Sequence, residues 1–154
     1  MSQRIYLDHA ATTPVLPQAQ AAMADALGRW ANPSSPHADG RAARAALEEA
    51  RAAIAEALGW RHDVIFTSGA SEAVAIVAAR AKVEGRLAGA TEHDAVLAAM
   101  GSDARVIPVD AKGLAEPGGL EQASLVAIQH VNNETGVIQP IDDIAAALRA
   151  AGGL

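Results

Sequence analysis

A short polar turn is the first place where this sequence could do chemistry. Residues 66–73 read FTSGASEA, so a glycine and two serine hydroxyls stand where a helix is expected to begin. Unpaired backbone amides and the positive end of the helix dipole suit such a turn to a phosphate group. The commoner use of these residues is a helix cap, with Ser68 or Ser71 capping and Glu72 in the first turn. The turn alone does not decide between the two.

Two further polar clusters follow apolar stretches of the chain. His93 lies in TEHDAV, after RLAGA, and its ring could stack on a planar cofactor or carry a proton near neutral pH. Asn132, Asn133 and Glu134 follow SLVAIQHV, where amide groups can orient a ligand oxygen or nitrogen. Each cluster also has a structural explanation, because a histidine can cap a helix and NNETG is rich in turn-forming residues.

A polar loop at residues 32–41, NPSSPHADGR, is a candidate substrate contact. His37 and Arg41 could meet an anionic group of a substrate. The alternative is a solvated loop in which Asp39 or Gly40 begins the next helix.

The elements that must position these clusters alternate between strand and helix, which is typical of an α/β fold with a mainly parallel sheet and flanking helices. Short apolar runs predict strands over 5–7, 63–67, 86–91, 105–109 and 124–131. Helical spacing and end signals predict helices over 17–30, 41–59, 71–85, 93–101 and 141–153, with a helical turn at 119–123.

The three polar clusters TSGASE, TEHDAV and HVNNETG each follow a predicted strand. Right-handed crossovers put the carboxyl ends of parallel strands at one edge of a sheet. Ligands of open α/β sheets bind at that edge. We therefore expect the three clusters to meet there and to form a pocket.

Composition limits the classes of function. The chain has 154 residues, 51% of them hydrophobic, a formal net charge of −6 and no cysteine. This is a globular composition without the basic patch that a nucleic-acid surface requires. The absence of cysteine excludes disulfides and thiolate metal sites, and the motifs suggest no other metal site. No apolar run has the length of a membrane span, and MSQRIYLDHA has no signal-peptide core, so we expect a cytoplasmic protein.

Taken as a set, the motifs carry a family resemblance. IYLDHAATTPV, NPSSPHADGR, FTSGASEA, TEHDAV and HVNNETGVIQP occur in an order and at spacings that resemble the cysteine desulfurases. These are pyridoxal 5'-phosphate (PLP) enzymes of the class V aminotransferase family. The resemblance covers essentially the whole chain. It implies part of the large domain of a fold type I PLP-dependent transferase, with residues 1–15 belonging to the small domain and 16–154 to the large one.

The resemblance also implies roles for individual residues. The turn of Gly69, Ala70 and Ser71 would hold the cofactor phosphate, with serine at 71 where the family usually has threonine. His93 would stack on the pyridine ring and carry protons. Asn132 would lie beside cofactor and substrate, and we assign His37 to the substrate. Ala75 stands where the family often has asparagine.

The activity implied is conversion of L-cysteine to L-alanine, with the sulfur passing to an enzyme cysteine as a persulfide. PLP serves as the electron sink in such chemistry. The implied partners are a second subunit of a homodimer and a sulfur-acceptor protein, for example in iron–sulfur cluster assembly. No nucleic-acid or membrane partner is expected.

Several parts that the family uses are not expected within this sequence. The family's covalent lysine lies in a later serine-x-histidine-lysine motif, and its reactive cysteine lies further on. Lys82 and Lys112 match neither position. In the family sheet, the strand at 63–67 would have no neighbour among the other strands of this chain. We therefore expect an N-terminal portion of a larger enzyme, inactive alone.

Three alternatives stay open. A related class V enzyme, such as a selenocysteine lyase or an aminotransferase-like member, shares the scaffold. A truncated, non-catalytic paralogue could bind a partner subunit. A plain α/β domain would require five motifs to coincide in order.

Overall fold

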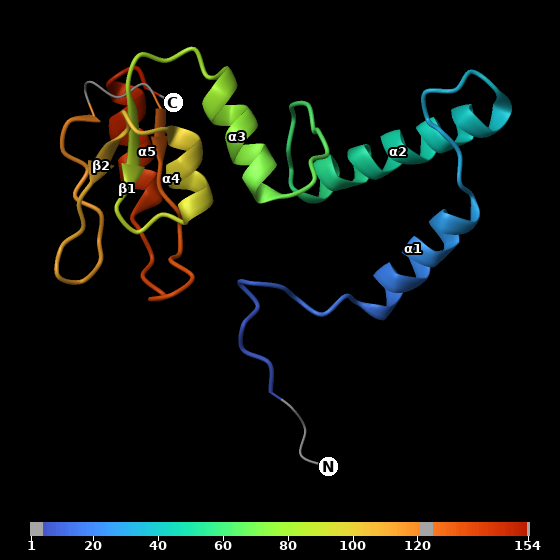
Figure 1. Cartoon of the computed structure of the whole chain (residues 1–154), viewed down its shortest axis with the longest axis horizontal. Helices are drawn as coiled ribbons and strands as arrows, with labels where there is room; N and C mark the ends of the chain where they lie inside the picture. The colour runs from blue at the N-terminus through green and yellow to red at the C-terminus, as the bar shows by residue number, and fades with distance from the viewer. Residues whose placement is uncertain (1–4, 121–124, 154) are drawn as a thin grey trace. The chain divides into compact units, whose positions relative to one another are not determined.

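The computed structural model describes residues 5–120 and 125–153, which form two compact units. The first unit ends at Phe66 and the second begins at Thr67 (Figure 1). The domain boundary expected after residue 15 stays a prediction.

The first unit contains two helices, α1 (Pro17–Gly28) and α2 (Ala38–Ala57). Proline suits the first position of α1 because its missing N–H would have no helical partner there. Helix α2 begins three residues earlier than predicted, because the His37 side chain caps it by accepting a hydrogen bond from the Gly40 amide. Gly40 is buried, and a Cβ on it would lie 2.3 Å from the Ser35 carbonyl oxygen, so only glycine fits at this position.

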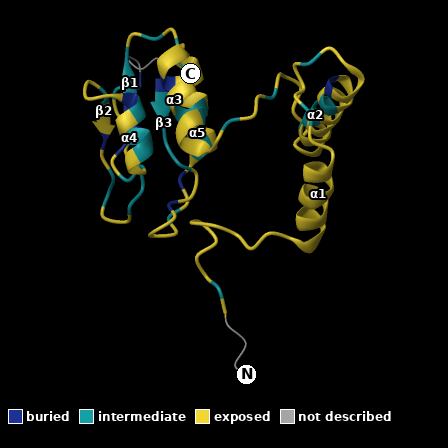
Figure 2. Ribbon diagram, turned by 45° about the vertical axis from the view of Figure 1, so that its right-hand side comes forward, coloured by how far each residue is buried: buried dark blue, intermediate teal, exposed yellow. Residues whose placement is uncertain are grey.

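Residues 5–66 bury no apolar side chain; in Figure 2 the ribbon of α1 is yellow, for exposed, and that of α2 is partly teal, for intermediate burial. The predicted strand at 5–7 is wrong, because this segment makes no ladder in the structure. The predicted strand at 63–67 is wrong as well. Ile65 is 67% exposed and Phe66 46% exposed, and no described strand pairs with this segment. A strand needs a partner for its backbone groups, so an apolar stretch without one stays irregular.

The second unit is a parallel α/β arrangement, as predicted. Its described strands are β1 (Arg86–Gly89), β2 (Arg105–Ile107) and β3 (Leu125–Ala127), in the order β2-β1-β3. Both pairings of β1 are parallel; Leu87 is opposite Arg105 in β2 and Val126 in β3. Its helices are α3 (Ala70–Arg80), α4 (Asp94–Met100) and α5 (Ile141–Ala150). The helical turn predicted at 119–123 falls largely outside the described residues.

The core of this unit lies on both faces of β1. On one face Leu87 and Ile107 pack with Leu148 of α5. On the other face Ala88 packs with Ala78 of α3 and Met100 of α4. Leu87 is only 2% exposed, and burying such a side chain stabilises the fold by roughly 1.5–3 kcal/mol. The helices on the two faces therefore bury β1, which is the central described strand because it pairs with both β2 and β3. Within the described residues, no helix has the length and apolar character needed to cross a membrane.

Candidate active site

Two of the three polar clusters line one cavity of about 400 Å³ in the second unit. One wall is the segment 90–94, which follows β1, and the other is the segment 132–135, which follows β3 by a few residues. Because β1 and β3 are parallel neighbours, their carboxyl ends lead into the same space. This part of the expected pocket is confirmed.

His93 in the first wall is the N-cap of α4. Its Nδ1 accepts a hydrogen bond from the Ala95 amide at 3.1 Å, and the residue is exposed. A ring nitrogen that accepts an amide hydrogen bond carries no proton, so the neutral ring holds its proton on Nε2. His93 therefore combines the capping role with a free N–H donor and an accessible ring.

Asn132 in the second wall is buried, with 6% of its surface exposed. Its Oδ1 accepts from the Glu134 amide, the Thr135 amide and the Thr135 hydroxyl, at 3.0, 2.8 and 3.1 Å. Its Nδ2 donates to the Thr91 carbonyl oxygen at 3.1 Å. Four hydrogen bonds inside the protein leave one N–H of this amide available to a ligand.

Asn133 has no individual role in the family resemblance, although its amide is among those expected to orient a ligand. It lines the same space and is exposed, and its amide makes no hydrogen bond to any residue that the structure describes. The pair of adjacent asparagines was the available signal. The pattern could not tell which of the two holds the turn and which faces outward.

The turn before α3 does not belong to the lining of this cavity. Its Gly69 is the N-cap, with an extended backbone and no side-chain cap bond, so neither Ser68 nor Ser71 caps the helix. Glu72 instead reaches back, and its carboxylate accepts from the Ser68 amide at 2.6 Å. This hydrogen bond lowers the pKa of Glu72. The exposed Ser71 hydroxyl stays available at the helix N-terminus.

A second, more apolar cavity of about 390 Å³ lies between α3 and β3. Ala73 and Val74, in the first half of α3, line it together with Gln129. Glu92 lines both cavities. The second cavity therefore adjoins both α3 and the His93 cavity, but the turn at 67–71 lines neither cavity.

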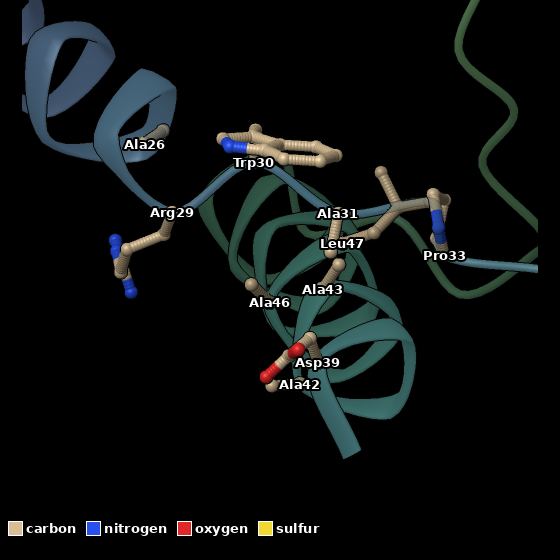
Figure 3. Close-up of a pocket in the computed structure, with 10 residues that line it drawn as sticks. All are labelled: Ala26, Arg29, Trp30, Ala31, Pro33, Asp39, Ala42, Ala43, Ala46 and Leu47. Atoms are coloured by element: carbon tan, nitrogen blue, oxygen red, sulfur yellow. The ribbon is translucent and has the colours of Figure 1, made fainter. Parts of the chain in front are cut away.

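His37 belongs to the first unit, where its Nδ1 caps α2. Arg41 donates to the Pro36 carbonyl oxygen within the same loop. The first unit also has an apolar cavity of about 590 Å³ beside α2. Figure 3 shows the ring of Trp30 extending over the helix face that carries Ala43 and Leu47.

Comparison with known proteins shows the family. The profile of the aminotransferase class-V family matches residues 5–154, so the chain belongs to that family. The chain is 38% identical to the cysteine desulfurase IscS of Dictyoglomus turgidum, covering 94% of this chain and 42% of that protein. It is 39% identical to the cysteine desulfurase of a Frankia species, over 96% of this chain and 42% of that protein. A solved NifS-like protein matches with a TM-score of 0.81 at 29% identity, over 97% of this chain and 46% of the other.

These comparisons confirm the resemblance and the fold class. The sheet with flanking helices is part of a PLP-dependent transferase fold of the class V type. The chain spans about two fifths of the length of the curated relatives that it matches.

We predict that two substitutions of His93 separate its capping from its chemistry. His93→Ala removes the cap of α4 and should lower the free energy of unfolding by about 1 kcal/mol. His93→Asn should keep most of that stability, because asparagine is a good N-cap, while it removes the imidazole. Urea unfolding of both variants measures this. Equal losses in the two variants would contradict the capping role.

We also predict an acid-sensitive contribution from Glu72. Its pKa is lowered from 4.5 in the fold, so the unfolded chain binds this proton more tightly than the folded chain. The contribution is therefore present above pH 4.5 and is lost as the pH falls through the lower folded pKa. Glu72→Gln should cost more stability at about pH 6 than at about pH 3, measured by urea unfolding. An equal cost at both pH values would contradict the hydrogen bond to Ser68.

Proposed function

We propose that this chain supplies the phosphate-binding turn and one cofactor wall of a PLP-dependent cysteine desulfurase. The observation that carries the proposal is the cavity in which His93 and the two asparagines meet, beyond the ends of adjacent parallel strands. Membership in the class V family and identity to named cysteine desulfurases support the reaction class.

The residues present fit both the phosphate group and the pyridine ring of the cofactor. The amides of Gly69, Ala70 and Ser71 and the Ser71 hydroxyl stand at the start of an eleven-residue helix, where an anionic phosphate is favoured. Glu72 is also in that turn, but its carboxylate is engaged with the Ser68 amide. The exposed His93 ring suits the face of a pyridine ring.

Each residue has a definite part in this proposal. Bound PLP supplies an electron sink for bond breaking at the substrate amino acid. His93 can stack on the cofactor ring and hold a proton at Nε2. Asn132 and Asn133 line the space beside them, and His37 is assigned to the substrate. The substrate is L-cysteine, and the sulfur passes to a cysteine that this sequence does not contain.

The proposal assigns the covalent lysine to neither lysine of this sequence. Lys82 follows the carboxyl end of α3, so the length of that helix separates it from the turn at Gly69 by roughly 16 Å or more. Lys112 lies in a turn held by Asp110, whose carboxylate accepts from the Lys112 amide. The intact enzyme is proposed to be a cytoplasmic homodimer that passes sulfur to an acceptor protein.

A second candidate is a non-catalytic chain that binds a larger class V subunit. The observation that favours it is the apolar surface of the first unit, where Trp30 is 87% exposed above the groove in Figure 3. Co-purification with a larger class V chain distinguishes this candidate. A selenocysteine lyase or an aminotransferase-like activity fits the same site residues.

We predict weak, reversible binding of PLP without covalent capture at a lysine. Equilibrium dialysis should show a dissociation constant that rises about tenfold in Ser71→Ala, because one hydrogen bond to a charged group is lost. His93→Asn should have a similar effect, because it removes the ring and keeps the cap. His62→Asn, in the first unit, is the matched control. Borohydride followed by mass spectrometry should find no adduct specific to one lysine.

A single adduct fixed at Lys82 or Lys112 would contradict this assignment of residues. Binding that is unaffected by Ser71→Ala and His93→Asn would place the ligand elsewhere.

A further inference from the structure

The two walls of the His93 cavity are joined by hydrogen bonds between segments about forty residues apart in sequence. The Thr91 carbonyl oxygen accepts from Gln129 Nε2 at 2.6 Å and from Asn132 Nδ2 at 3.1 Å. The Gln129 amide donates to Glu92 Oε1. These bonds tie the chain after β1 to the chain after β3.

Asn132 differs from Gln129 because it belongs to a wall itself. Its oxygen organises its own wall through Glu134 and Thr135, and its nitrogen reaches Thr91 in the opposite wall. Among the described residues that line the cavity, it is the one side chain with hydrogen bonds to both walls. Its burial keeps water from competing for these bonds.

We propose that Asn132 is a positioning residue that sets the spacing of the two walls and thereby places the His93 ring opposite Asn133. Thr91 is two residues before His93, so holding its carbonyl fixes the start of α4 and the residue that caps it. The inference rests on the proposed function only for the identity of the ligand between the walls. The spacing itself is a property of this chain.

The primary amide is the group that this position requires. The second wall presents three donors to Oδ1, and the first wall presents a carbonyl that needs a donor. Aspartate can accept in the same places but, when ionised, has no hydrogen to donate. Asn132→Asp therefore removes the hydrogen bond from the second wall to Thr91 and leaves the acceptor of the turn in place, while Gln129 Nε2 can still donate to the Thr91 carbonyl oxygen.

The test is amide hydrogen exchange of the 15N-labelled chain at neutral pH, without ligand. In Asn132→Asp, exchange at Glu92 and Gln129 should become about fivefold faster or more, since a lost hydrogen bond corresponds to that order of change. The Glu134 and Thr135 amides should keep their protection, and the ring signals of His93 should shift. Asn133→Asp adds the same charge to the same wall without cutting the link, and should leave Glu92 and Gln129 protected.

Unchanged exchange at Glu92 and Gln129 in Asn132→Asp would overturn the proposal, and so would an equal change in Asn133→Asp. Asn132→Asp could also reduce the protection of the Glu134 and Thr135 amides in its own wall. In that case Thr135→Ala distinguishes the two effects, because it removes a hydrogen bond within that wall and leaves the bond from Asn132 to Thr91 in place. If the Glu92 and Gln129 amides keep their protection in Thr135→Ala, the result supports the link through Asn132. If they lose their protection in this variant, the result overturns the proposal. Because no ligand is used, a failure to bind PLP leaves this result unaffected.

Discussion

Parallel pairing of β1 with β3 is the interaction on which the candidate site depends. Residues 86–88 pair with residues 125–127, so both strands run in the same direction to the same edge. Helices α3 and α4 cover one face of β1 and α5 covers the other, which buries this central strand. The segments that follow the two strands, 90–94 and 132–135, therefore line the same cavity. His93 and the asparagines meet there because of the strands, although they are about forty residues apart in sequence.

The polar residues at this edge serve the fold and the site together. His93 caps α4 with its Nδ1, and its Nε2 takes no part in that cap. Glu72, in the first turn of α3, accepts a hydrogen bond from the Ser68 amide, and the neighbouring Ser71 is exposed. The Asn132 side chain makes four hydrogen bonds within the protein, three accepted by Oδ1 and one donated by Nδ2. A substitution at any of these positions therefore tests chemistry only if the replacement keeps the structural bond.

The sequence was sufficient to predict the parallel sheet and two of the three clusters at its edge, because apolar runs followed by turn residues mark the strands, although β1, β2 and β3 end two to four residues earlier than predicted. The strand predicted at 63–67 is wrong, but the expectation that this stretch has no neighbour among the other strands is confirmed for the described residues, and the missing neighbour explains why it stays irregular. The sequence could not separate Asn132 from Asn133, because burial and hydrogen bonding distinguish them and residue type does not. It did not predict that His37 caps α2, and the substrate contact assigned to His37 stays a prediction.

We propose that PLP binds at the carboxyl edge of the second unit. A titration of the 15N-labelled chain with PLP, followed by amide chemical shifts, tests this proposal. Binding at this edge should shift only the amides of residues 69–72, 91–94 and 132–134. Shifts at the apolar cavity beside α2 in the first unit, or around Lys82 after the carboxyl end of α3, would contradict the proposal.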